Sequence, residues 1–260
     1  ALGRLGCPVA MVGAGGQDAA GDTLLESLQA AGVDCSCVAR REAPTGQAFI
    51  TVDSAGENAI IILAGANSTV SPADVEKLRP LLAQADCLVL QLEIPLETVM
   101  AAAKLARSLG KVVILDPAPA PGSLPEELLA LCDYLKPNET ELALLTGLPT
   151  ATVEQCETAA RQLLAQGVGT VLVSLGAKGA LAVTPQEALL VAPPQVKAVD
   201  TTSAGDCFTA AFALRLVEGE TSLQAALEFA NTAAALTASR PGAQASIPAR
   251  DEVEALLAAR

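Results

Sequence analysis

The sequence of 260 residues contains no histidine. This absence excludes zinc sites of the histidine type, and it excludes every Ser–His or Cys–His catalytic couple. Any acid–base chemistry must therefore rest on carboxylates, lysine, tyrosine or cysteine. The seven cysteines form no C-x-x-C pair and are scattered along the chain, which agrees with an intracellular protein.

Basic residues are few: 16 Lys and Arg stand against 29 Asp and Glu, which gives a net charge of −13. This balance argues against a general nucleic-acid binder and against binding to anionic membranes. A small anionic substrate is not excluded, because one pocket of backbone N–H groups outweighs the net charge. The longest apolar run, residues 59–64, is far shorter than the ~20 residues of a membrane helix. With 51% hydrophobic residues and no leader pattern, we expect a soluble, cytoplasmic, globular protein.

Short β-rich runs alternate with longer helical patterns along the chain. Strands are predicted at residues 9–12, 87–91, 112–116 and 170–174, and helices at 23–31, from 71, 96–109, from 138, 152–166, 204–217 and 223–239. Two antiparallel pairs are predicted, 47–52 with 58–63 and 179–183 with 188–192.

Uniformly apolar strands that alternate with helices indicate a parallel sheet covered on both faces. We therefore predict the α/β class, a doubly wound and mostly parallel sheet with helices on both faces. No repeat or linker divides the chain, so residues 1–260 form one predicted domain. Residues 44–63 break the strand–helix alternation and are predicted to be a β-hairpin lid inserted in that domain.

Two glycine-containing segments are candidates for phosphate binding. Residues 12–18 resemble a dinucleotide fingerprint, but Asp18 stands where the third glycine belongs and no helix is predicted directly behind it. An ordinary strand-to-helix turn is favoured there over an NAD site. Residues 174–179, with two glycines and Lys178, are either a loop that approaches a nucleotide phosphate or a simple turn.

Asn138 and Glu141 begin a predicted helix with the spacing of a capping box, which favours a structural role. The alternative is that Glu141 orients water around a phosphate-bound Mg²⁺.

Residues 200–208 are the most specific segment, because a second acid, Asp206, follows small residues at the start of a helix. Uncovered backbone N–H groups and the helix field would stabilise a phosphoryl group in transfer there. Asp206 would accept a proton from an attacking hydroxyl. Taken alone, the segment also fits an ordinary acid in the first turn that stabilises the helix dipole.

These segments together resemble the PfkB-type carbohydrate kinases, over nearly the whole chain and in the same order. The D-T-T-x-A-G-D-x-F pattern of that family matches residues 200–208, its N-x-x-E pattern matches Asn138 to Glu141, and its nucleotide loop matches residues 176–179. Residues 44–48, 56–58, 65–67, 90–95 and 242–246 are similar to those of the ribose-phosphorylating members.

The resemblance implies ATP-dependent phosphorylation of the primary hydroxyl of D-ribose. It implies that Asp206 is the base and touches the sugar together with Glu93. The backbone of Ala204 and Gly205 would form the anion hole. ATP would be held by Asn138, Ser174, Gly176, Ala177, Lys178, Gly179, Gly205 and Asn231.

Two metal ions are also implied by the resemblance. Glu141 would act on Mg²⁺ through water. An activating monovalent cation, K⁺, would be surrounded by Asp200, Thr202, Thr237, Arg240, Gly242 and Ser246, most of them through backbone oxygens. The exposed apolar run of the lid, residues 59–63, indicates a homodimer clasp.

The chain departs from the family pattern at two places. Ser203 stands where glycine or alanine is usual. Residues 1–6 resemble the end of the helix that follows the first strand and a sugar-binding glycine-rich segment, so the chain is expected to begin inside the fold and its activity is in question. Three alternatives remain. The chain is another sugar or nucleoside kinase, such as a fructokinase, or a non-catalytic remnant that binds nucleotide only. An NAD-dependent oxidoreductase is a more distant alternative.

Overall fold

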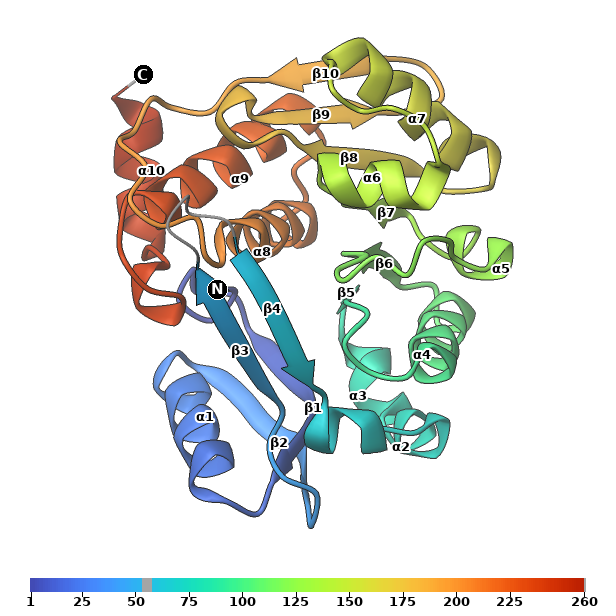
Figure 1. Cartoon of the computed structure of the whole chain (residues 1–260), viewed down its shortest axis with the longest axis vertical. Coiled ribbons are helices and arrows are strands. Elements are labelled where there is room, and N and C mark those ends of the chain that lie inside the picture. The colour runs from blue at the N-terminus through green and yellow to red at the C-terminus, as the bar shows by residue number, and fades with distance from the viewer. Residues whose placement is uncertain (53–57, 260) are drawn as a thin grey trace.

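A six-stranded sheet forms the centre of the protein (Figure 1). The structure, a computed structural model, describes residues 1–52 and 58–259. Its strands lie in the order β10 (Ala188–Val191), β9 (Ala180–Val183), β8 (Thr170–Ser174), β7 (Tyr134–Leu135), β6 (Val112–Leu115) and β5 (Cys87–Leu90). Pairing is parallel from β5 to β8 and antiparallel where β9 meets β8 and β10.

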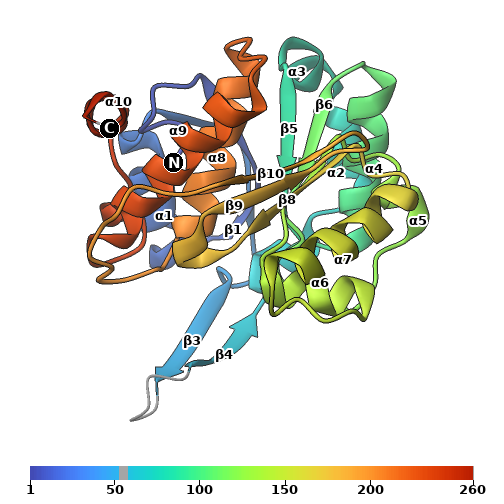
Figure 2. The same cartoon turned by 90° about the horizontal axis from the view of Figure 1, so that it is seen from above.

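Helices cover both faces of this sheet (Figure 2). One face carries α4 (Leu96–Ser108), α6 (Glu139–Thr146) and α7 (Val153–Ala165), and the other carries α8 (Ala204–Val217) and α9 (Leu223–Ala238). Successive residues of β6 show the reason: Val113 and Leu115 belong to the core under α4 and α7, whereas Ile114 belongs to the core under α8 and α9. Because both faces are apolar, the predicted doubly wound α/β fold is confirmed.

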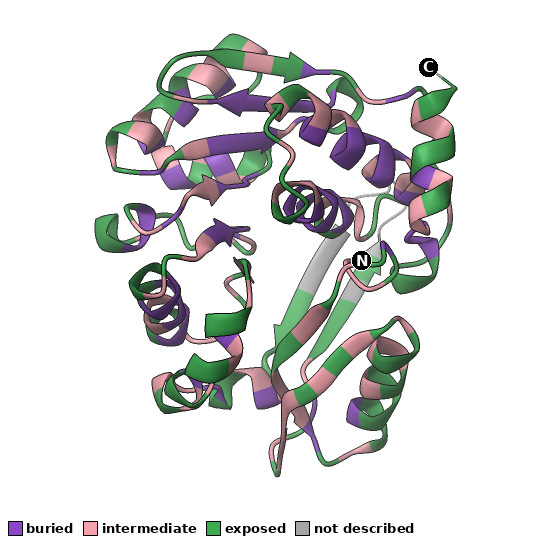
Figure 3. Cartoon of the chain, turned by 180° about the vertical axis from the view of Figure 1, so that it is seen from behind, coloured by how far each residue is buried: buried purple, intermediate pink, exposed green. Residues whose placement is uncertain are grey.

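Figure 3 shows that burial concentrates in the central strands and in α8 and α9. The remaining helices lie around this core: α2 (Pro72–Lys77), α3 (Arg79–Gln84), α5 (Glu126–Leu129) and α10 (Arg250–Ala258), with 3₁₀ turns at Gly65–Thr69, Gly176–Lys178 and Gln244–Ser246. Within the described residues, none of the helices combines the length and the apolar character that crossing a membrane requires.

A separate parallel pair, β1 (Val9–Gly16) and β2 (Val33–Arg41), carries α1 (Ala19–Ala30). Strand β2 was not among the predicted strands, because its polar and small residues lack the apolar run of a buried strand. It was also wrong that no helix opens behind the glycines, since α1 begins at Ala19 with Asp18 as its N-cap. Residues 1–6 form a hydrogen-bonded turn, closed like a helix C-terminus with Gly6 at a φ of 80°.

The antiparallel pair β3 (Gln47–Val52) and β4 (Asn58–Leu63) extends away from the sheet (Figure 2). Both strand bounds agree with the sequence prediction, while residues 53–57, which include most of the 56–58 segment, lie outside the described residues. Described side chains on this ribbon are strongly exposed: Phe49 is 50%, Ile61 63% and Leu63 55% exposed.

Asp18 fastens the base of this ribbon to α1. Its Oδ1 accepts hydrogen bonds from Gly21 N–H at 2.8 Å and from the Thr45 hydroxyl at 2.5 Å, and its Oδ2 accepts from Thr45 N–H at 2.8 Å. The Thr45 hydroxyl in turn accepts from Gly16 N–H at 2.9 Å. The bonds from Thr45 and then from Gly21 lower the pKa of Asp18 to about 2.

Most other elements lie where the sequence placed them. The strand at Thr170–Ser174 and the helix at Ala204–Val217 have the predicted bounds, and α9 ends one residue earlier than predicted. The helix predicted from residue 71 begins with a capping box between Ser71 and Asp74.

We predict that Asp18→Asn loosens the ribbon at Thr45, because an amide cannot accept all three of these hydrogen bonds. The variant is expected to melt at a lower temperature than the parent and to be cut faster by trypsin after Arg41. The difference in melting temperature should be constant above about pH 5 and shrink as the pH falls toward 2, because the lowered pKa stabilises the fold only where Asp18 is ionised.

Asp34→Asn is the matched control, because the Asp34 carboxylate caps only Ser36 within its own strand. It should leave cleavage after Arg41 unchanged. Equal melting temperatures and equal cleavage rates for Asp18→Asn and the parent would contradict the role of this tether.

Candidate active site

The N-terminus of α8 presents unpaired backbone N–H groups. The Ala204 N–H donates to the Thr201 carbonyl at 3.2 Å, and the first bond of the helix ladder is from Cys207 N–H to Ser203 O at 2.9 Å. Among the described residues, the N–H groups of Gly205 and Asp206 have no acceptor. The positive end of the 14-residue helix therefore offers two donors to an anion, beside an exposed carboxylate.

A buried ion pair lies under this helix start. The Lys136 ammonium is 2.6 Å from Asp116 Oδ2, and the two side chains are 5% and 4% exposed. The Thr209 hydroxyl of α8 lies 3.0 Å from Asp116 Oδ2 and 3.0 Å from the Gly205 carbonyl. A Cβ on Gly205 would stand 3.2 Å from the Lys136 nitrogen, so the ammonium approaches the anion-binding turn directly.

Strand register explains why this pair meets α8. Leu115 of β6 is in register with Leu135 of β7, so the next residues, Asp116 and Lys136, are neighbours on the opposite face of the sheet. That face carries Ile114 and belongs to the core under α8 and α9. Sequence reasoning missed both residues as site residues. The available signal was a charged residue directly after each of two buried strands.

The carboxylates of Glu93 and Asp116 both interact electrostatically with Asp206 at the start of α8. Burial raises the pKa of Glu93, and the charges of Asp206 and Asp116 raise it further. Burial also raises the pKa of Asp116 in spite of the adjacent Lys136 ammonium. The predicted residues Glu93 and Asp206 therefore lie near enough for their charges to interact, and Asp116, which is bonded to Thr209 of α8, interacts with both.

Asn138 and Glu141 form the predicted capping box at the start of α6. Asn138 Oδ1 accepts from Glu141 N–H at 2.8 Å, and Glu141 Oε2 accepts from Asn138 N–H at 2.8 Å. Burial raises the pKa of Glu141; the Asn138 N–H opposes the rise, and the charge of Asp116 adds to it. The Glu141 side chain thus caps a helix and lies near enough to Asp116 for their charges to interact, so the structural and the metal-binding interpretations are compatible.

The predicted nucleotide loop lies beside Asn138. Asn138 pairs with Ser174 in a parallel bridge. In the following 3₁₀ turn, Gly176 has a φ of 55° and is exposed, and a Cβ added there would meet no atom within 4 Å, which leaves the backbone accessible. Gly179 is needed for packing instead, because a Cβ there would lie 2.1 Å from the Val191 carbonyl. The Lys178 ammonium is exposed and lies 3.6 Å from Glu139.

Asn231 has a structural partner in α9. Its side chain is 4% exposed, and Nδ2 donates to the Val191 carbonyl at the end of β10 at 2.8 Å. This bond joins α9 to the sheet edge next to Gly179. The predicted adenine contact of Asn231 stays a prediction.

The residues predicted around a monovalent cation meet in part. Asp200 Oδ1 accepts from the N–H and hydroxyl of Thr202 at 2.9 and 2.6 Å, and Oδ2 accepts from Gly242 N–H at 2.9 Å. The Arg240 guanidinium is engaged by Glu252 at 2.5 Å. The buried hydroxyls of Thr237 and Ser246 bond within their own segments, to Ala233 and Ala243 carbonyls. Asp200 thus joins the loop before α8 to the loop after α9.

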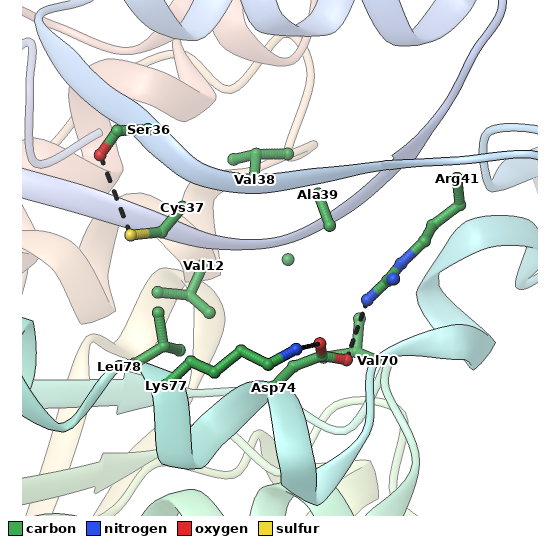
Figure 4. A pocket seen from close by; sticks show the side chains of 11 residues that line it. Val12, Ser36, Cys37, Val38, Ala39, Arg41, Val70, Asp74, Lys77 and Leu78 are labelled. Carbon is green, nitrogen blue, oxygen red and sulfur yellow. Dashed lines mark hydrogen bonds and ion pairs between the residues drawn. The ribbon is translucent and has the colours of Figure 1, made fainter.

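A cavity of about 300 Å³ lies away from this site, between β1, β2 and the start of α2 (Figure 4). Asp74 at its wall accepts from Arg41 at 2.9 Å and from Lys77 at 3.2 Å. Hydrogen bonds from Ser71 above all, then from Lys77 and Arg41, hold the pKa of Asp74 well below its usual range. The residues that line this cavity include none of the site residues Glu93, Asp116, Lys136 and Asp206.

In the described part of the chain, no group of three or more Cys, Asp or Glu is arranged to hold a metal ion by itself.

Comparison with known proteins agrees with this geometry. Residues 1–250 match the pfkB family of carbohydrate kinases. A Staphylococcus aureus ribokinase is 41% identical over 92% of this chain and 78% of its own length, and one from Haemophilus influenzae is 40% identical over 97% and 82%. The structure of Arabidopsis thaliana ribokinase complexed with ribose and ATP has a TM-score of 0.90 and 39% identity, covering 98% of this chain and 83% of that one.

Ser203, just before α8, has a φ of 61°, and its side chain makes no capping bond within the described part of the chain. Because this left-handed conformation costs an L-residue about 1–2 kcal/mol, we predict that Ser203→Gly raises stability despite the flexibility of glycine. For a chain of this size the melting temperature should rise by about 1–4 °C. Ser203→Val should lower it, because β-branched residues fit this region worst.

Ser239→Gly is the control, since Ser239 ends α9 at a φ of −81° and bonds the Leu236 carbonyl. It should not stabilise the protein. Strain at Ser203 would be refuted by a melting temperature of Ser203→Gly at or below that of the parent.

Proposed function

Because the chain belongs to the pfkB family of carbohydrate kinases, we propose that it transfers the γ-phosphoryl group of ATP to the primary hydroxyl of D-ribose, giving ribose 5-phosphate. The observation that carries this proposal is the first turn of α8, where unpaired N–H groups and the Asp206 carboxylate stand together. The Arabidopsis relative, whose structure contains ribose and ATP, supports the choice of substrates.

The chemistry follows from that turn. Asp206 accepts the proton of the sugar hydroxyl as the hydroxyl oxygen attacks the γ-phosphorus, while the bond from this phosphorus to the bridging oxygen breaks and ADP leaves. The N–H groups of the turn stabilise the phosphoryl oxygens. Gly205 N–H is available for this, whereas Ala204 N–H must give up its 3.2 Å bond to Thr201 to take the role assigned to it. Besides burial, the charge of Asp206 raises the pKa of Glu93, which fits a Glu93 contact with a sugar hydroxyl held near the base.

ATP would lie along Asn138, Ser174 and residues 176–179, with its phosphates directed toward Gly205. The open backbone at Gly176 fits this path. The buried Asn231 would support the adenine end from beneath, through its bond to the Val191 carbonyl.

Mg²⁺ fits the donor chemistry of Glu141. One oxygen of this carboxylate holds the Asn138 N–H, and the group lies close enough to Asp116 for their charges to interact. A hard cation prefers oxygen ligands and keeps several waters, so Glu141 would hold Mg²⁺ through water. Bound Mg²⁺ neutralises charge on the ATP phosphates.

A monovalent cation, K⁺, would lie between the loops that Asp200 joins. Asp200 supplies the negative charge, and backbone oxygens near Thr202, Thr237, Arg240, Gly242 and Ser246 would supply the ligands. When bound, the cation adds positive charge next to the segment that leads into α8.

A homodimer through the β3–β4 ribbon and a cytoplasmic location complete the proposal. A two-stranded ribbon is marginal by itself. Phe49 is paired with Ile61, so these two exposed side chains share one face of the ribbon with the exposed Leu63 and offer an apolar surface to a second copy. Seven unpaired cysteines suit a reducing compartment.

We predict that Asp206→Asn lowers kcat for ribose phosphorylation by about 10²–10⁴-fold while ATP affinity changes little, because the amide keeps the size of the side chain but cannot accept the proton. Asp251→Asn, the same change in the first turn of α10, is the control and should leave kcat unchanged. The assay follows ADP release with ribose, fructose and a nucleoside in parallel. A loss below tenfold would show that Asp206 is not the base, and nucleotide binding without turnover of any sugar would refute the proposed activity.

Asp200→Ala is expected to raise the K⁺ concentration for half-maximal activity more than it raises KM for ATP at saturating K⁺, because it removes the one charged ligand proposed. Asp200→Asn, which keeps a hydrogen-bond acceptor for the loop, should share the K⁺ effect but retain more thermal stability. K⁺ is varied against choline chloride at constant ionic strength. A K⁺ dependence identical to that of the parent would rule out this site.

A further inference from the structure

Negative charge dominates the surroundings of the proposed phosphoryl-transfer site. Four carboxylates interact there: Glu93, Asp116, Glu141 and Asp206. A triphosphate brings more negative charge to the same place. Of the cations in the described residues, Lys136 is the one whose charge acts on Asp116 and Glu141.

The position of Lys136 directs its charge at α8. The ammonium approaches Gly205 so closely that a Cβ there would be 3.2 Å away. Asp116 Oδ2, at 2.6 Å, is its partner among the described residues. An ammonium carries three donors, so two of them remain for other acceptors.

Stability does not explain this pair. A buried ion pair usually contributes little net stability, because the desolvation of both charges offsets their attraction. Here Asp116 Oδ1 is also buried without a hydrogen-bond partner among the described residues. Burial keeps the pKa of this acid raised even with the ammonium beside it. The burial of both charges and of an unpaired carboxylate oxygen is unfavourable for folding. A role of this pair in the site accounts for it better than a role in stability.

We propose, on the basis of the proposed function, that Lys136 is the positioning cation of the anion-binding turn. Asp116, which accepts a hydrogen bond from Thr209, holds this ammonium beside Gly205, where its charge strengthens the field of the α8 N-terminus. In this buried region the field is weakly screened, so it offsets the carboxylates and draws the γ-phosphoryl group toward Gly205 and Asp206. Lys136 acts through the turn, and Asp206 remains the group that takes the proton.

The first test separates this role from a structural one. Lys136→Met removes the charge and keeps the length of the side chain, but it leaves Asp116 buried and unpaired. The double variant Lys136→Met/Asp116→Asn removes both charges and keeps the Thr209 contact. We expect the single variant to melt at a lower temperature and the double variant to recover most of the loss.

Activity should not follow stability in this pair of variants. We expect kcat to fall by about 10–100-fold in the single variant, somewhat less than for loss of a direct oxyanion donor, and to stay low in the double variant. Lys104→Met is the control, because Lys104 pairs with Glu127 on the surface at 2.7 Å. Recovery of kcat together with the melting temperature would overturn the proposal in favour of a structural role.

The second test needs no sugar. Isothermal titration compares the non-hydrolysable ATP analogue AMP-PNP with ADP, both with Mg²⁺. Loss of Lys136 should weaken AMP-PNP binding by about tenfold or more and leave ADP binding nearly unchanged, because the charge acts on the γ-phosphate. An unchanged ratio of the two affinities would overturn the role of Lys136.

The two tests also distinguish this inference from the proposed function. A parent protein that prefers AMP-PNP to ADP but phosphorylates no sugar would refute the proposed function alone, and the affinity ratio would still decide the role of Lys136. A parent protein that binds neither nucleotide would overturn both.

Discussion

The parallel register of β6 and β7 is the constraint on which the site depends. Because Leu115 lies beside Leu135, the two strands end level, and the residues after them emerge side by side on the α8 face. Helix packing on both faces holds this register, since a slip of one residue would move every side chain to the other face. The start of α8 is thereby held over the strand ends, where open α/β sheets bind their ligands.

Several residues of the site serve the fold and the proposed chemistry together. Asn138 and Glu141 cap α6 with two reciprocal hydrogen bonds, and Asp200 joins two loops with both of its oxygens. Such bonds fix the direction of each carboxylate before any ligand arrives. Preorganisation of this kind reduces the reorganisation needed during the reaction, so a structural role for these residues supports a functional one.

Other features of the site reduce stability. Ser203 has a left-handed backbone. The pair of Asp116 and Lys136 is buried, and one oxygen of the Asp116 carboxylate has no hydrogen-bond partner among the residues that the structure describes. Both lie within one turn of the same helix start or directly under it. Strained and desolvated groups persist where the surrounding structure holds them, and they concentrate at functional sites.

The sequence by itself determined the elements with strong local signals. The helix at 204–217, the strand at 170–174 and the Asn138 capping box follow from apolar period, small residues and caps, and each is present in the structure. It also placed Glu93 and Asp206 in one site, through their resemblance to a family. Only the tertiary structure revealed β2, the tie between Asp18 and Thr45, and the ion pair of Lys136 with Asp116. These depend on which strands and loops become neighbours, and pairing between residues 20 or more apart leaves no periodic trace in the chain.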